Sequence, residues 1–361
     1  MRRTLPFMAT LVLAALVATA CGASTSAGEA GSGEGTVQEL LTYDGEDRQE
    51  RLLEGAREEG TVVVYTNSQQ AEEVTKGLFE EEYPFIDVEL FYGSSTDITS
   101  RISEEYAAGR HDVDVVQTGP NDLRGLDRQG FLQAFHTSEA EHFPEEAFGP
   151  DNLWITSNES RYAMAYNPDN FDAAELPTDI EDLLDEKYKG KMAIGPGTGT
   201  RWLGTYVESG YEDVMRGLAD QQVTSHNIKG RALTDLVVSG EILLYPAANF
   251  AHVMQSQEKG APVEWSPLNP TFVAGAALAV ASEVAHPHAA LLWNDFMLSE
   301  AGQQVYVDNY YFVYRDGLAD VFGEVDYELM QEADVPEGGT YDELYAKWEG
   351  IYDEVFMSSG Q

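Results

Sequence analysis

The chain has 361 residues, enough for about two domains with a sizeable core, and its 43% apolar and 11% aromatic content is that of a folded chain rather than a disordered one. It carries 63 Asp and Glu against 21 Lys and Arg, a formal net charge of −42. Such a surface repels phosphate backbones and anionic headgroups, which excludes nucleic acid as a partner. Because the acids are spread along the chain, we interpret them as a strongly hydrated surface rather than as an acidic binding patch.

Residues 1–20 have the pattern of a secretory signal peptide, in which a basic start precedes an apolar run and a small-residue cleavage site. The apolar run, residues 5–17, is too short to span a bilayer, which needs roughly 20 residues. Cys21 is the only cysteine, so neither an internal disulfide nor a cysteine-rich metal site can form. The small residues before Cys21 resemble the lipobox of bacterial lipoproteins, and we expect Cys21 to be acylated. The alternative is ordinary cleavage after Ala20, which leaves the cysteine unmodified.

Residues 21–47 are predicted to be a lipidated, flexible tether, because the segment after Cys21 is rich in Ser, Gly, Glu and Thr. The folded body is expected to begin near Asp47. Strand, polar turn and helix then alternate three times, which is typical of a doubly wound α/β lobe with a parallel sheet. The predicted strands are 61–65, 86–91 and 113–117, and the predicted helices are 48–59, 71–82, 97–108 and 122–129.

The second half of the chain shows the same alternation. Its exit turn at 246–249 is polar at its end, and residues 327–357 read as two acidic helices with an aromatic face. The predicted strands are 192–194, 242–245 and 273–280. One predicted helix ends near residue 208, and the others cover residues 212–220, 230–239 and 288–298.

Polar turns follow the predicted strands, and in α/β sheets ligands lie beyond the carboxyl ends of the strands. The helix N-termini in these turns present free backbone N–H groups, which favour anionic groups. Each turn has an alternative interpretation, in which its residues only cap the helix that follows. The candidate ligand-binding residues in these turns are Thr66, Asn67, Ser68, Ser94, Ser95, Gly119, Asn121, Thr198, Thr200, Arg201, Trp202 and Asn249.

Motifs of catalysis are absent from the sequence: it contains no GxSxG elbow, no phosphate-binding loop and no HExxH. His286 and His288 flank a proline and are interpreted as a helix start rather than a metal pair. Asp112 and Asp114 are interpreted as a chance pair among many acids rather than an acid–base pair. We therefore expect no enzyme activity, no cofactor and no metal site.

A family resemblance begins with LLEGAREEGTVVVYT at residues 52–66. This segment resembles the opening of extracellular solute-binding proteins of bacterial ABC importers, most closely the branch that contains the ferric-iron binders. The resemblance covers roughly residues 48–317 and returns in the segments 107–116, 187–194, 238–242, 259–263 and 296–303.

The resemblance implies a type II periplasmic-binding-protein fold: two α/β lobes, joined by crossing strands, trap a small solute and deliver it to a permease. By this analogy the strands cross at 161–167 and return near 273–280, which places Arg161 at the crossing as a further candidate ligand-binding residue. Lobe one would be residues 48–163 with 275–325, lobe two residues 164–274, and residues 326–361 would form C-terminal helices.

The match departs from the ferric binders at their metal ligands. Those proteins use adjacent tyrosines where this chain has Phe250 and Ala251, and a histidine near the place of Gln69. We therefore expect no ferric site of the tyrosinate type. Tyr310 and Tyr311 align with a later segment and are interpreted as aromatic packing under the C-terminal helices.

The combined expectation is a monomeric, extracytoplasmic receptor that is held at the cell membrane by its lipid anchor alone. Either Arg161 or Arg201 is predicted to clamp a carboxylate, phosphonate or sulfonate in two-point fashion, so the solute is expected to be a small anionic or zwitterionic organic molecule. A cation such as a polyamine is the rival solute. The alternative functions are a sensor or adhesion lipoprotein on the same fold, and a secreted enzyme.

Overall fold

The computed structural model describes residues 36–318, 327–336 and 339–357. The predicted signal peptide, the lipidation residue Cys21 and most of the predicted tether lie outside these residues. Thr36 caps α1 (Val37–Leu41), whose Leu41 is fully buried. The folded chain therefore begins earlier than the predicted start near Asp47. No helix in the described ranges is both long enough and apolar enough to cross a bilayer.

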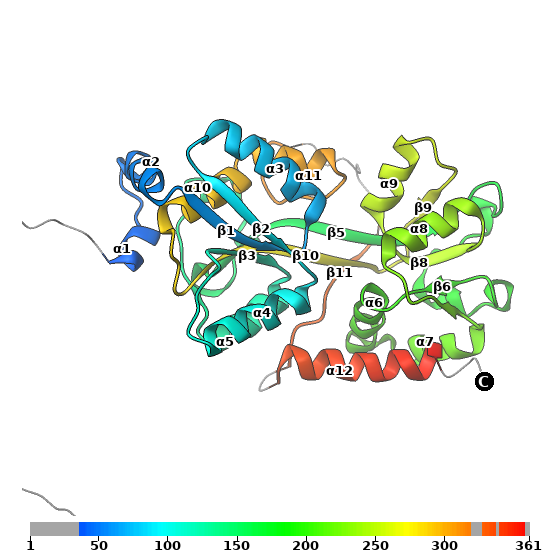
Figure 1. The fold of residues 1–361 in the computed structure, drawn as a ribbon. Helices are drawn as coiled ribbons and strands as arrows, with labels where there is room; N and C mark the ends of the chain where they lie inside the picture. The colour runs from blue at the N-terminus through cyan, green and yellow to red at the C-terminus, as the bar shows by residue number, and fades with distance from the viewer. Residues whose placement is uncertain (1–35, 319–326, 337–338, 358–361) are drawn as a thin grey trace, which may run out of the picture. The chain divides into compact units, whose positions relative to one another are not determined.

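The first lobe has the predicted alternation of strands and helices (Figure 1). β1 pairs in parallel with β2 on one side and with β3 on the other. Gly60 ends the first helix of this lobe in a left-handed conformation with φ 70°, which suits a residue without Cβ. The elements are α2 (Arg48–Glu59), β1 (Thr61–Thr66), α3 (Gln69–Glu82), β2 (Asp87–Tyr92), α4 (Ser95–Ala107), β3 (Val115–Thr118) and α5 (Pro120–Arg128).

Two long antiparallel strands connect the two halves of the molecule, β5 (Trp154–Tyr166) and β10 (Thr271–Ala281). β10 also pairs antiparallel with β3, so the sheet is mixed rather than purely parallel, with the order β2-β1-β3-β10-β5-β8. The far end of β5 pairs with β8 (Leu244–Asn249) and β9 (Glu264–Ser266). The predicted boundaries of lobe one (48–163 with 275–325) and lobe two (164–274) stay predictions, and we keep these two names for them.

Lobe one is completed by elements that follow β10. The apolar helix α10 packs on α2, as its buried Leu291, Trp293 and Met297 require. The next helix, α11, was not predicted and contributes Tyr306 to the same core. These two helices are α10 (Pro287–Leu298) and α11 (Glu300–Asp308). The short strand β4 (Leu132–Gln133), which precedes β5 in the chain, pairs antiparallel with the end of β10.

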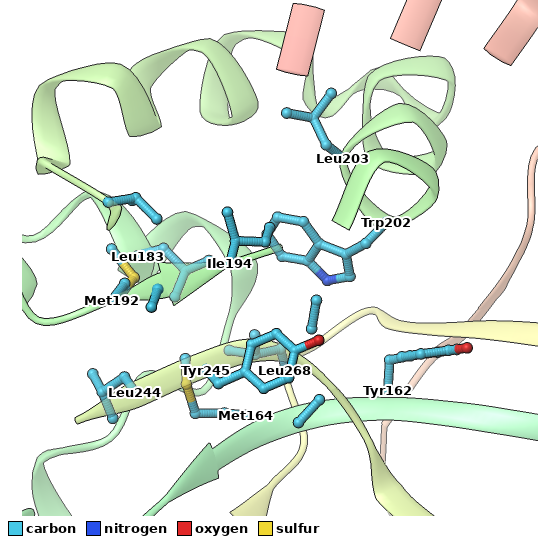
Figure 2. Packing of buried hydrophobic residues seen from close by; sticks show 14 of the residues in the cluster. Tyr162, Met164, Leu183, Met192, Ile194, Trp202, Leu203, Leu244, Tyr245 and Leu268 are labelled. Atoms are coloured by element: carbon cyan, nitrogen blue, oxygen red, sulfur yellow. The ribbon is translucent and has the colours of Figure 1, made fainter. Parts of the chain in front are cut away.

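Lobe two packs its helices around a separate core, part of which is shown in Figure 2. Met164, Trp202 and Tyr245 meet in this core, which places Trp202 among buried apolar side chains. The predicted exit turn at 246–249 forms the last four residues of β8, and an unpredicted helix follows it. The elements are β6 (Ala193–Ile194), α6 (Thr198–Tyr206), a π turn (Val207–Tyr211), α7 (Glu212–Gly217), β7 (Thr224–Ser225), α8 (Gly230–Ser239) and α9 (Phe250–Glu258).

The C-terminal segment, residues 327–336 and 339–357, contains one strand, one α-helix and a short π turn (Asp353–Met357) instead of the two predicted helices. The strand β11 (Leu329–Gln331) pairs in parallel with β10, and the helix α12 (Tyr341–Tyr352) lies along α6 (Figure 1). Trp348 is fully buried against Gly204, where an added Cβ would lie 2.1 Å from the indole ring. α12 therefore completes the core of lobe two and does not form a separate layer.

Candidate functional site

A cavity of about 890 Å³ is lined by residues of both predicted lobes and of the C-terminal segment. It lies at the carboxyl ends of the parallel strands, as expected for α/β sheets. Two further hollows, of about 450 and 410 Å³, are smaller. The predicted residues that the structure brings together in the wall of the large cavity are Asn67, Ser68, Ser94, Ser95, Thr198, Arg201 and Asn249.

Several helices begin at this cavity. Ser94 accepts a hydrogen bond from the backbone N–H of Asp97 (3.2 Å), and Asn249 accepts one from that of Ala251 (2.9 Å). These side chains therefore cap helices, as the alternative interpretation held, and they also face the cavity. The backbone N–H groups and the helix dipoles at such ends favour a negative charge. The N-cap residues in the wall are Ser68 of α3, Ser94 of α4, Gly197 of α6, Lys229 of α8 and Asn249 of α9.

The charged side chains of the wall are predominantly basic, in a chain whose net charge is −42. Among the described residues that line the cavity, Arg201, Lys229 and Arg231 are basic and Glu73 is acidic. Arg231 donates to the carbonyl of His252 (3.4 Å) and to the side-chain oxygen of Gln255, neither of which is charged. Lys229 is exposed at the start of α8. Both cations can therefore meet an anion in the cavity.

His252 contributes a neutral imidazole to the same wall. Burial, and then the positive charge of Arg231, lower the pKa of His252 to about 3. Its Nδ1 atom is buried and has no hydrogen-bond partner among the described residues. A neutral ring nitrogen of this kind can still accept or donate one hydrogen bond.

Arg201, which was predicted to clamp the solute, is paired with a carboxylate of the protein. Its Nε donates to Glu332 at 2.9 Å, and its Nη2 donates to the other carboxylate oxygen of Glu332. Tyr341 donates to Glu332 as well (2.8 Å). The two-point clamp expected for the solute is thus occupied by a carboxylate of the chain itself, and Lys229 and Arg231 are the cations left for a solute.

Asp122 lies next to this pair and is buried in lobe one. Burial raises the pKa of Asp122 to about 6, the charge of Arg201 lowers it, and the charge of Glu332 raises it further. A Cβ at Gly119 would lie 2.9 Å from the Asp122 carboxylate and 3.6 Å from Nη2 of Arg201. Asp122, Arg201 and Glu332 therefore form a cluster that joins lobe one, lobe two and the C-terminal segment next to the cavity.

Arg161 lies elsewhere, in the wall of the 450 Å³ hollow. Its Nε donates to Glu159 (3.3 Å), and its guanidinium carbon lies 3.2 Å from the centre of the Phe312 ring. Its charge and its packing surface are therefore both used within the protein. Arg161 does not line the 890 Å³ cavity, and its role at a solute stays a prediction.

Other predicted residues support the wall from behind instead of lining it. Thr66 is buried and donates to the side chain of Gln117 (2.6 Å). The Asn121 amide donates to the carbonyl of Ala333 (3.0 Å). Thr200 and Trp202 are on the buried side of α6. The predicted residues that do not line the cavity are Thr66, Gly119, Asn121, Arg161, Thr200 and Trp202.

Tyrosines form much of the wall, and most of them were missed. Phe250 stacks edge-on against Trp265 with ring centres 4.6 Å apart, which is a packing role. Tyr311 packs on Tyr306 of α11 but also reaches the cavity, so its interpretation as packing under the C-terminal helices was incomplete. Burial raises the pKa of Tyr311 to about 12, which disfavours a phenolate. The lining tyrosines are Tyr92, Tyr162, Tyr245, Tyr311, Tyr341 and Tyr345.

The acid and histidine pairs singled out in the sequence have structural roles. The Asp114 carboxylate accepts the backbone N–H of Val63 (2.8 Å) and lies 2.8 Å from Nδ1 of His286. His288 contacts Glu59 at 2.6 Å near the start of α10. No group of three or more His, Cys, Asp or Glu side chains in the described ranges could hold a metal ion.

Comparisons with known proteins agree with this fold. Residues 78–313 match the family described as bacterial extracellular solute-binding protein. Among solved structures, iron-bound HitA from Pseudomonas aeruginosa is 21% identical, with a TM-score of 0.66 over 83% of this chain and 99% of that chain. The substrate-binding protein of an ABC transporter from Agrobacterium tumefaciens is 16% identical, with a TM-score of 0.71 over 83% and 96%.

AfuA from Actinobacillus pleuropneumoniae, with fructose 6-phosphate bound, is 17% identical, with a TM-score of 0.66 over 82% of this chain and 98% of that chain. No curated protein sequence matches the chain. The predicted fold class, α/β and similar to periplasmic binding proteins, is confirmed.

Proposed function

Because the chain belongs to the bacterial extracellular solute-binding proteins, we propose that it is the receptor of an ABC importer. It captures a small organic anion in the 890 Å³ cavity and delivers it to a permease. The family acts outside the cytoplasm and binds rather than converts its solute.

The charge of the cavity carries this proposal. Lys229 and Arg231 line the cavity, and the helices α8 and α9 begin there with their positive dipole ends. A polyamine would need carboxylates in the wall, where Glu73 is the acidic side chain among the described lining residues. The net charge of the chain repels anions at long range, but salt screens that field within about 10 Å at 0.1 M. The local cations act at contact distance.

Of the two ligands named for similar structures, iron and fructose 6-phosphate, the organic anion suits the residues of this cavity better. Iron suits a set of phenolates and carboxylates, whereas this chain has Phe250 and Ala251 at the place of the tyrosine pair. Fructose 6-phosphate, bound to AfuA, is an organic anion of the kind that Lys229 and Arg231 would accept. The similarity supports the class of solute and not the identity of the sugar phosphate.

Capture requires the lobes to close on the solute about β5 and β10, which connect them. A solute that contacts the starts of α4 in lobe one and of α8 in lobe two gains contacts only when the lobes are close. Binding therefore shifts the population toward the closed state.

The decisive measurement is a thermal-shift panel followed by calorimetry, with inorganic phosphate, citrate, fructose 6-phosphate and spermidine as probes. We expect an anion to stabilise the protein and Arg231→Ala to weaken its binding about tenfold, since a hydrogen bond to a charged group contributes about 1.5–3 kcal/mol. Arg110→Ala is the matched control, because Arg110 is exposed outside the cavity wall and pairs with Asp112 (3.5 Å). Stabilisation by spermidine alone, or an anion affinity that Arg231→Ala leaves unchanged, contradicts the proposal.

The anchor is a separate part of the proposal. Cys21 follows a signal-peptide pattern and is the only thiol that could be acylated. A Cys21→Ser variant should be released from membranes by a salt wash, whereas the unchanged chain stays bound. Retention of the variant would show that something other than the lipid holds the protein.

A sensor or adhesion lipoprotein on the same fold is the second candidate. Genes for a permease and an ATPase beside the gene of this chain would favour the importer. A monomer is expected in either case. Sedimentation of the purified protein in an analytical ultracentrifuge tests this oligomeric state.

A further inference from the structure

The C-terminal segment, residues 327–336 and 339–357, contacts both lobes beyond its strand β11, which pairs with β10. On lobe one, Asn121 of α5 donates to the carbonyl of Ala333 (3.0 Å), and Arg124 pairs with Asp334 (3.2 Å). Further along α5, Arg128 donates to the carbonyl of Gly339. The segment therefore runs across the surface of α5 before α12 begins.

The same segment is attached more firmly to lobe two. Trp348 fills the space above Gly204, where an added Cβ would overlap with its ring. The Tyr352 hydroxyl lies 2.9 Å from that of Ser225, and Arg216 donates to Glu354 (2.8 Å). These contacts fix the rotation of α12 about its axis, and hence the direction in which its first turns face.

Those first turns face the cavity. Tyr341 and Tyr345 lie in its wall, one helical turn apart, with ring centres separated by 6.0 Å. Both residues are half-buried and line the cavity. Tyr341 is held in place by its hydrogen bond to Glu332, which in turn holds Arg201.

We propose that the C-terminal segment is a third wall of the solute cavity and that Tyr345 and Tyr341 contact a flat ring of the bound solute. The inference rests on the proposed function, since it requires an anion in the cavity, and it narrows the solute to a ring-bearing organic anion. Aromatic faces favour the stacking of flat rings, whereas a free inorganic anion gains nothing from them. Glu332 neutralises Arg201 on this side of the cavity, so the anionic group is directed to Lys229 and Arg231.

The test compares two probes that share one anionic group, inorganic phosphate and phenyl phosphate, by calorimetry on the full chain. We expect the wild type to bind phenyl phosphate about tenfold more tightly than phosphate, which corresponds to about 1.4 kcal/mol for the ring. Tyr345→Ala should remove most of this preference and leave the phosphate affinity within about twofold. Tyr345→Phe should retain the preference, because the ring remains.

Tyr83→Ala is the matched control, because Tyr83 is a half-buried tyrosine of lobe one that does not line the cavity. It should change neither affinity. Arg231→Ala tests the proposed function separately, since it should weaken both probes by the same factor and leave their ratio unchanged.

Hydrogen exchange gives a readout that needs no variant. Binding of phenyl phosphate should slow the exchange of the backbone amides of residues 343–347 more than binding of phosphate does. An unchanged ratio of affinities in Tyr345→Ala, or equal exchange with both probes, overturns the third wall while the anion site stands. If neither probe binds the wild type, both the anion site and the third wall are wrong.

Discussion

Glu72 lies in the first turn of α3 and is fully buried, although its side chain carries a carboxyl group. Tyr306 of α11 donates a hydrogen bond to one carboxyl oxygen at 2.7 Å. The other oxygen has no hydrogen-bond partner among the described residues. Burial raises the pKa of Glu72 to about 7 from its ordinary value of 4.5, and the hydrogen bond from Tyr306 offsets only part of that increase.

The raised pKa makes folding stability depend on pH. A carboxyl group whose pKa is higher in the folded chain holds its proton more tightly there, so its contribution to stability is complete below pH 4.5 and is lost as the pH rises through 7. One pKa unit corresponds to about 1.4 kcal/mol, so the whole loss is roughly 3 kcal/mol. Most of it falls between pH 5 and pH 8.

The measurement is urea unfolding of the wild type and of Glu72→Gln at pH 5 and pH 8. Glutamine has nearly the same shape, still accepts the hydrogen bond from Tyr306 and does not ionise in this range. The free energy of unfolding of Glu72→Gln, relative to the wild type, should increase by about 2.5 kcal/mol from pH 5 to pH 8. The difference cancels other titrating groups, including Asp122.

Glu105→Gln is the control, because Glu105 is also buried but pairs with Arg101 at 2.7 Å. This change removes an ion pair and should lower stability at both pH values. A relative stability of Glu72→Gln that stays the same from pH 5 to pH 8 would refute the reasoning from burial.

Three further outcomes are expected. Gly204→Ala should lower the free energy of unfolding by about 1–3 kcal/mol, because its Cβ would lie 2.1 Å from Trp348, whereas Gly350→Ala, with no atom within 4 Å, should be neutral or stabilising in urea unfolding. The melting temperature should rise with NaCl up to 1 M, since the net charge of −42 repels itself and screening shortens from about 30 Å to about 3 Å between 0.01 and 1 M; a flat or falling curve contradicts this. Ferric citrate should produce no intense visible band, because Phe250 occupies the place of a phenolate ligand and burial raises the pKa of Tyr311.

Local signals were sufficient to predict much of the fold from the sequence. The bounds of α2 and α8 agree with prediction, because each ends at a glycine in the left-handed conformation, Gly60 and Gly240. The apolar runs of β1 and β10 identified buried strands. The strand β11 has no such run, since it consists of Leu329, Met330 and Gln331, and only its pairing with β10 makes it a strand.

The site was less predictable, because it depends on which side of a helix a residue occupies and on contacts between distant segments. Thr198 and Arg201 are three residues apart on α6 and line the cavity, whereas Trp202 and Tyr206 lie on the buried side. The helical spacing is visible in the sequence. The composition of the turn does not separate the two sides of the helix, however, so it predicts ligand contacts for Thr200 and Trp202 as well. The partner of Arg201 lies 131 residues away, and nothing local identifies it.

Lys229 and Arg231 were missed for a related reason. They lie at the start of α8, next to a strand of only two residues, β7, that was not predicted. Without that strand, no turn of the α/β pattern pointed to them. A search for basic residues at helix starts in an acidic chain would have found both.

The last helix returns to a lobe that the chain has already left through β10. Tyr352 and Phe356 are buried in the same cluster as Met164, so the core of lobe two contains residues that are far apart in the sequence. This arrangement sets an order of folding. A chain that leaves the ribosome with its N-terminus first cannot complete the core of lobe two until α12 has been synthesised. Until then, the side of α6 that packs against Trp348 stays exposed. Contacts between residues so distant in sequence also form slowly, because a long loop must close before any of them contributes.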